Sequence, residues 1–92
     1  MEFEWDPAKA RQNLLKHKLS FDDAARALAD PDRLESIDDR SDYGEDRVQT
    51  ICRLDTDFLF VVSVVRRPDL TRIISARRAT RYEETLYYRR GW

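Results

Sequence analysis

The side chains best suited to chemistry in this 92-residue chain are one histidine and a row of arginines in its second half. Histidine changes its charge near neutral pH, so His17 is a candidate for transferring protons, although at the end of a predicted helix it also suits capping or packing. One histidine cannot act as both acid and base in a two-histidine ribonuclease mechanism. An enzyme built on this sequence would therefore need arginine, lysine, glutamate or tyrosine for the other steps.

The arginines make the second half of the chain cationic. Residues 1–46 hold seven Lys/Arg and thirteen Asp/Glu, a balance of −6, whereas residues 47–92 hold ten Arg and five Asp/Glu, a balance of +5. Guanidinium groups bind phosphate through two parallel hydrogen bonds. The asymmetry favours an anion-binding face with nucleic acid as the partner, against the plainer interpretation that these charges only solvate strand and helix surfaces.

The central elements are two strands. Phe58–Val65 is an apolar, β-branched and aromatic run, which predicts a strand covered on both faces. Arg66–Asp69 contains Pro68 and predicts a turn, so Thr71–Arg78 should return as an antiparallel strand. Alternation should leave at least one arginine from each strand end on the open sheet face, with Arg53 on a third strand. Such a cluster would suit a scissile phosphate.

The other elements follow from caps and alternation. Asp6 and Pro7 predict a helix to about His17, and Ser20 predicts a second one ended by Asp30–Pro31. Thr80 and Glu83 predict a capping box on a last helix to about Arg90. Strands are expected at 3–5, 34–38 and 47–54, with turns at 42–44 and 55–57. The predicted fold is α+β, an antiparallel meander sheet of about four strands with two N-terminal helices and one C-terminal helix on one face.

Length and composition indicate a single domain over residues 1–92. The single Cys52 rules out an intramolecular disulfide and a cysteine-based zinc site, and it alternates toward an apolar row. We find neither metal-ligand spacing nor a glycine-rich phosphate loop, so we expect no metal and no cofactor. No apolar run approaches the roughly 20 residues of a membrane span, and we expect a cytoplasmic protein.

Three blocks of sequence resemble a known family. They are FEWDPAKARQNLLKHKLSFDDAARAL, the EDRVQTI stretch, and RIISARRATRYEE. Together they are similar to BrnT toxins, the toxin halves of BrnT/BrnA toxin–antitoxin pairs. Lys18 and Cys52 depart from the pattern, because glycine is common at both positions.

The resemblance implies a RelE-like fold and a ribonuclease that arrests translation. It also implies a BrnA-like antitoxin as partner, which binds operator DNA through its own domain. We expect metal-independent cleavage by attack of the ribose 2′-hydroxyl. The predicted catalytic residues are His17, Lys16, Arg66, Arg77, Arg78 and Glu83. The predicted RNA-binding residues are Lys9, Arg53, Arg67, Arg72, Arg81 and Tyr87.

Two further expectations concern partners. A non-catalytic module that recognises an acidic protein or nucleic acid through the same arginines is the alternative to an enzyme. If the chain is a toxin, its sheet should carry more apolar surface than its helices cover. We expect that surface to be contiguous with Arg66, Arg77 and Arg78, so that an antitoxin covering it also blocks catalysis.

Overall fold

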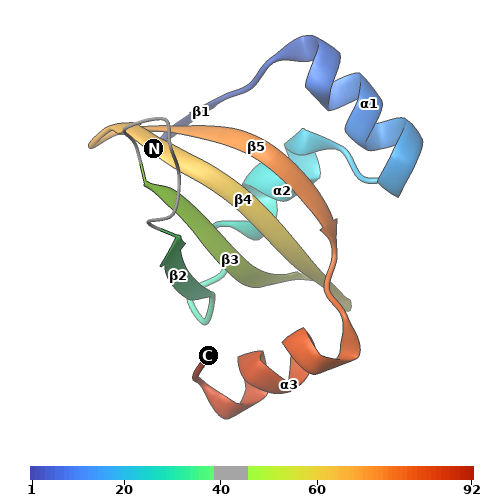
Figure 1. Ribbon diagram of the computed structural model, residues 1–92, viewed down its shortest axis with the longest axis vertical. Helices are drawn as coiled ribbons and strands as arrows, with labels where there is room; N and C mark the ends of the chain where they lie inside the picture. Colours follow the sequence, from blue (N-terminus) through green and yellow to red (C-terminus); the bar gives the residue numbers. More distant parts are fainter. Residues whose placement is uncertain (39–45) are drawn as a thin grey trace.

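The computed structural model describes residues 1–38 and 46–92, and the turn predicted at 42–44 lies outside them. Three helices and five strands form within these residues (Figure 1). In chain order they are β1 (Glu2–Glu4), α1 (Pro7–His17), α2 (Phe21–Ala27), β2 (Leu34–Asp38), β3 (Arg47–Leu54), β4 (Asp57–Arg67), β5 (Leu70–Arg78) and α3 (Arg81–Arg89). The predicted α+β class and the order of its elements are confirmed.

The strands form one sheet in the order β1-β5-β4-β3-β2. Strands β2 to β5 are the predicted antiparallel meander. Strand β1 adds a fifth strand and pairs in parallel with the first half of β5, with Glu4 opposite Arg72. The sheet is therefore mixed, and the second half of β5 extends beyond β1.

The sheet is covered by helices on both faces. Leu59 and Val61 of β4 pack with α2 residues such as Phe21 on what we call the α1/α2 face. Phe58 and Phe60 alternate with them and pack against Leu86 and Tyr87 of α3, on the α3 face. The prediction that β4 is covered on both sides is confirmed. The prediction that all helices share one face is wrong, because α3 packs on the opposite row of β4.

One buried side chain attaches α1 to the edge of β5. Asn13 is 7% exposed, and its Nδ2 donates to the carbonyls of Ala76 at 2.8 Å and Leu19 at 3.0 Å. Its Oδ1 accepts from the Ala76 N–H at 3.1 Å. The amide thus pairs with the backbone of β5 as a neighbouring strand would. As a result α1 runs along the outer side of β5 (Figure 1).

The helix ends explain one departure from the family pattern. Lys18 caps α1 in the left-handed conformation with φ 57°, where glycine is favoured because it has no Cβ. Lys18 Nζ donates to the Leu15 carbonyl at 3.1 Å. The helix ends at His17 as predicted. The predicted caps Asp6, Ser20 and Thr80 are also confirmed, the last with its full capping box.

A bulge changes the predicted rows of β5. Ser75 lies opposite Val62 and Ile73 opposite Ser63, so Ile74 is the extra residue. Ile73 therefore joins Ala76 in the core of the α1/α2 face. Strict alternation along the strand predicted at 71–78 would put Ile74 in this row with Ala76, and that expectation is wrong because the bulge puts Ile73 there instead.

Candidate active site

The arginines of the hairpin divide between its two ends. Arg77 lies opposite Phe60, whereas Arg67 lies opposite Leu70. At about 3.3 Å per residue, Arg66 is about 20 Å along β4 from Phe60. The prediction that Arg66, Arg77 and Arg78 form one cluster around a phosphate is therefore wrong. An antiparallel return places the end of β4 beside the start of β5, not beside its end.

Predicted site residues from several elements lie toward the end of β5, a region that we call the β5 end. It includes both faces of the sheet, because Arg78 is in the row of the α1/α2 face and Arg53 is in the row of the α3 face. Arg78 lies opposite Leu59, and Arg53 of β3 lies opposite Phe58. Asn13 fixes α1 at Ala76. His17 is one helical turn past Asn13 and Arg78 is two residues past Ala76, each about 6 Å farther along. Since α1 and β5 run in the same sense (Figure 1), His17 and Lys16 approach the β5 end.

Arg77 and Glu83 form a closed pair within the β5 end. Arg77 Nη1 and Nη2 donate to Glu83 Oε1 and Oε2 at 2.8 and 2.9 Å. Glu83 also accepts the Thr80 N–H at 2.8 Å, and the Arg77 guanidinium lies 4.2 Å from the centre of the Phe60 ring. These contacts join β5, β4 and the start of α3. The pair suits a positioning role better than the predicted direct role in catalysis.

The charges of this pair stabilise each other. The hydrogen bond to Glu83 raises the pKa of Arg77, against a smaller lowering by burial. Burial raises the pKa of Glu83, but the hydrogen bonds from Arg77 and the Thr80 N–H together lower that pKa more, so the net shift is downward. Both groups are therefore ionised at neutral pH, and Glu83 is not a free base.

Replacing Glu83 with glutamine should lower the free energy of unfolding at neutral pH by about 1–3 kcal/mol, because the charged hydrogen bonds are lost. The pKa of Glu83 is below its ordinary value of 4.5 in the folded protein, so its ionised carboxylate stabilises the fold at pH above 4.5. This stability is lost as the pH falls through the lowered pKa. Urea unfolding of wild type and E83Q should thus show a difference that shrinks in acid. Glu84→Gln is the matched control, and a difference independent of pH would contradict the assignment.

Arg78 is more accessible than Arg77. Its side chain is 55% exposed and pairs with Asp57 at 3.3 Å, where the carboxylate is also exposed. An exposed ion pair contributes little stability, so a phosphate can replace Asp57 at small cost. Arg53 is also exposed, with its Nε donating to the Asp55 carbonyl at 2.7 Å. Arg81 is exposed at the first position of α3.

His17 and Lys16, the two residues predicted to transfer protons, lie in the last turn of α1. Lys16 is exposed, and His17 is half-buried as the last residue of α1. Within residues 1–38 and 46–92, the His17 ring makes no hydrogen bond or ion pair. The ring is therefore not held by a polar partner among these residues.

Tyr87 has a structural role instead of the predicted contact with RNA. Tyr87 is 7% exposed, and its ring packs edge-on against Phe58 at 5.2 Å. Its hydroxyl donates to Asp30 at 2.7 Å, and Asp30 also accepts the Arg53 N–H at 2.9 Å. Burial and this hydrogen bond raise the pKa of Tyr87 to about 12. Burial raises the pKa of Asp30, but its hydrogen bonds lower it overall.

The other predicted residues lie away from the β5 end. At the hairpin turn, Arg66 and Arg72 reach Glu4 at 4.0 and 3.4 Å, and Arg67 pairs with Asp69 at 3.9 Å. Lys9 is exposed in the first turn of α1, about 12 Å along the helix from His17. The structure does not bring these four residues to His17 and Arg78.

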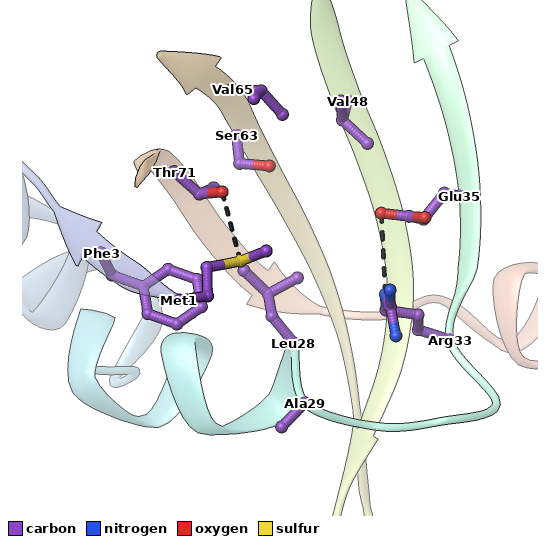
Figure 2. A pocket seen from close by; sticks show the side chains of 10 residues that line it. All are labelled: Met1, Phe3, Leu28, Ala29, Arg33, Glu35, Val48, Ser63, Val65 and Thr71. Atoms are coloured by element: carbon purple, nitrogen blue, oxygen red, sulfur yellow. Dashed lines mark hydrogen bonds and ion pairs between the residues drawn. The ribbon is translucent and has the colours of Figure 1, made fainter. Parts of the chain in front are cut away.

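Uncovered apolar surface lies near the hairpin turn. A hollow of about 450 Å³ lies on the α1/α2 face, and Figure 2 shows the side chains that line it. Met1, Phe3, Leu28 and Val65 line it, and the Thr71 hydroxyl donates to the Met1 sulfur at 3.6 Å. The expectation of surplus apolar surface is met. The expectation that it is contiguous with Arg77 and Arg78 is wrong, because they lie at the other end of β5.

The thiol of Cys52 could do chemistry by its type but is structural. Cys52 is fully buried in the α1/α2 core, and burial raises the pKa of its thiol to about 12, so it is not a nucleophile.

Across residues 1–38 and 46–92, no three His, Cys, Asp or Glu side chains gather as a metal site. In the same ranges, no helix is long and apolar enough to cross a membrane.

Comparison with known proteins identifies the family. Residues 5–83 match the family model described as the ribonuclease toxin, BrnT, of type II toxin–antitoxin systems. The chain belongs to the BrnT family. It is also similar to the crystal structure of the Brucella abortus ribonuclease toxin BrnT, with a TM-score of 0.64 and 21% identity over 88% of this chain and 99% of that one. No curated protein matches the sequence. The BrnT resemblance and its fold are thus confirmed.

The part of the sequence that matches the family model contains most of the residues of the β5 end. It includes His17, Arg53, Arg78 and the Arg77–Glu83 pair, and it ends at Glu83. The last two turns of α3 lie beyond it.

Proposed function

We propose that this chain is the toxin of a type II toxin–antitoxin pair and cuts RNA at the β5 end without a metal ion. The observation that carries the proposal is the Asn13–Ala76 pairing, which directs the end of α1, with His17, toward the end of β5, with the exposed and weakly paired Arg78. These groups suit the two needs of phosphodiester cleavage, which are proton transfer and stabilisation of negative charge.

In the proposed reaction, the ribose 2′-oxygen attacks the adjacent phosphorus and the bond to the 5′-oxygen breaks. His17 takes the proton of the 2′-hydroxyl, and the Lys16 ammonium gives a proton to the leaving 5′-oxygen. Arg78 binds the phosphorane, whose charge grows in the transition state. The products are a 2′,3′-cyclic phosphate and a 5′-hydroxyl. Arg53 and Arg81 contact neighbouring phosphates, and the Arg77–Glu83 pair holds α3 in place.

The biological setting of the proposal follows from the type II family. Cleavage of RNA in the cytoplasm arrests translation, and a BrnA-like antitoxin neutralises the toxin. Contact with operator DNA occurs only through that antitoxin. Because the apolar hollow lies far from the β5 end, an antitoxin anchored in the hollow needs a second segment to reach His17 and Arg78.

The direct experiment incubates the purified protein with end-labelled RNA in EDTA. We expect discrete fragments with cyclic phosphate ends, and arrest of a cell-free translation reaction by the same preparation. Binding of RNA without fragments would instead identify a non-catalytic module. Cleavage only after a divalent metal is added back would contradict the metal-independent mechanism.

A further inference from the structure

The outer side of α3 presents an unusual set of exposed side chains. Leu86 and Tyr87 face the sheet and are buried. The α3 outer face, as we call it, consists of the exposed residues Arg81, Tyr82, Thr85, Tyr88 and Arg89. Tyr82 is 67% exposed and Tyr88 is 66% exposed. Residues three, four and seven apart share one side of a helix, so the two tyrosines and two arginines form one surface.

This surface is held rigidly. The Tyr88 ring rests against Phe58 at 5.5 Å and meets Tyr87 at 5.8 Å with an angle of 90°. The capping box and the Arg77–Glu83 pair fix the first turn of the helix to the sheet. A tyrosine has few rotatable bonds, so a ring already supported in this way loses little entropy when a ligand stacks on it.

The charges around the α3 outer face favour a polyanion. Arg81 and Arg89 contribute two cations, and one carboxylate, that of Glu84, borders the face three residues after Arg81 and four before Tyr88. The other carboxylate of α3, that of Glu83, is neutralised by Arg77, so the cations exceed the half-buried Glu84. Arg53 adds a third cation, with its guanidinium 5.7 Å from the centre of the same Phe58 ring that supports Tyr88.

We propose that the α3 outer face is a stacking subsite for unpaired bases of single-stranded RNA. Single-stranded nucleic acid is bound by aromatic rings interleaved with cations, because every base has a face that stacks and every nucleotide carries a phosphate. In a duplex the bases are already stacked on each other and cannot reach Tyr82 and Tyr88. This inference rests on the proposed function, and it adds that the substrate is held by its bases beside the β5 end.

The subsite is tested with a probe that cannot be cut. A single-stranded 2′-O-methyl oligouridine lacks the attacking hydroxyl, so its binding is independent of catalysis. Each of Tyr82→Ala and Tyr88→Ala should weaken binding about 10-fold, and Tyr82→Phe and Tyr88→Phe should bind as wild type. Arg81→Ala and Arg89→Ala should make the affinity for the probe depend less steeply on salt concentration, because each removes a cation that contacts phosphate. The tyrosine variants should keep the salt dependence of wild type. The same oligonucleotide annealed to its complement should bind wild type more weakly.

Control measurements separate stacking from folding. Tyr88→Leu keeps an apolar contact with Phe58 but has no ring, so it replaces Tyr88→Ala if thermal unfolding shows that the alanine variant is not folded. Equal binding of wild type and the folded variants that lack an aromatic ring at position 82 or 88 would overturn the subsite. Equal binding of duplex and single strand would do the same. If Tyr82→Ala and Tyr88→Ala instead dissociate a homo-oligomer and bind the probe as wild type, the face is an interface between copies.

The two proposals fail in different ways. Loss of probe affinity in the tyrosine variants, in a protein that leaves natural RNA intact, supports the subsite and overturns the ribonuclease activity. Cleavage of RNA by a protein whose tyrosine variants bind the probe normally supports the activity and overturns the subsite.

Discussion

Replacement of His17 by glutamine should slow RNA cleavage by about 100- to 10,000-fold, the range expected when a general acid or base is lost. Glutamine retains hydrogen-bonding groups but does not take up a proton in the relevant pH range. The His17 side chain makes no hydrogen bond or ion pair within residues 1–38 and 46–92, so H17Q should unfold at the same temperature as wild type. Initial rates measured over a range of pH should lose an inflection in the variant.

The control for His17 is Arg11→Ala, which removes a charge from the same helix but lies two turns earlier. This variant should cleave at close to the wild-type rate. If H17Q kept the wild-type rate and pH profile, His17 would have no part in proton transfer.

Replacement of Asn13 by alanine should lower the free energy of unfolding by about 3 kcal/mol. The variant leaves the Ala76 N–H and two carbonyls without their partner at a buried position. Each unsatisfied buried group costs about 1–3 kcal/mol, partly recovered where water enters. A domain this small has a total stability of about 5–15 kcal/mol, so the loss is severe. Urea unfolding followed by circular dichroism measures it.

Gln12 provides the comparison for Asn13, because it is adjacent and exposed. Gln12→Ala should change the free energy of unfolding by no more than about 0.5 kcal/mol. Equal stability of the two variants would show that the edge of β5 does not depend on the Asn13 amide. In that case the Asn13 amide would not be what positions α1, and it would not be what directs His17 toward Arg78.

Local sequence signals predicted most of the elements. Asp6, Ser20 and Thr80 mark helix starts because their side-chain oxygens satisfy backbone N–H groups, and such bonds span only two or three residues. The apolar run at 58–65 predicted a strand buried on both faces, since β4 contributes to a core on each side. These features depend on neighbours close in the sequence.

Features that depend on distant partners were not predictable in the same way. The parallel pairing of β1 with β5 joins residues about 70 positions apart. The face on which α3 packs depends on contacts between α3 and side chains of β4, which is a different part of the sequence. The bulge at Ile74 shifts one row by a residue with no glycine to mark it. Alternation alone therefore placed Ile74 in the wrong row.

The candidate site was predicted in its residue types but not in its grouping. His17, Arg78 and Arg53 do lie toward one end of the sheet, yet Arg66 lies at the other end. The antiparallel register was already implied by the predicted turn at 66–69, so that separation was available from the sequence. The exposed Tyr88 was missed. Its spacing from Arg81 on the last helix was the signal that could have found it.

The most direct test of where the chemistry occurs compares two arginines of the same hairpin. Arg78 and Arg67 are both exposed, at 55% and 64%, and each pairs with a nearby aspartate. They differ in lying at opposite ends. In the RNA cleavage assay with EDTA, Arg78→Ala should lose at least about 100-fold in rate, as expected when a transition-state charge contact is removed. Arg67→Ala should stay within about 3-fold of wild type. The reverse order, or equal losses, would contradict a catalytic centre at the β5 end.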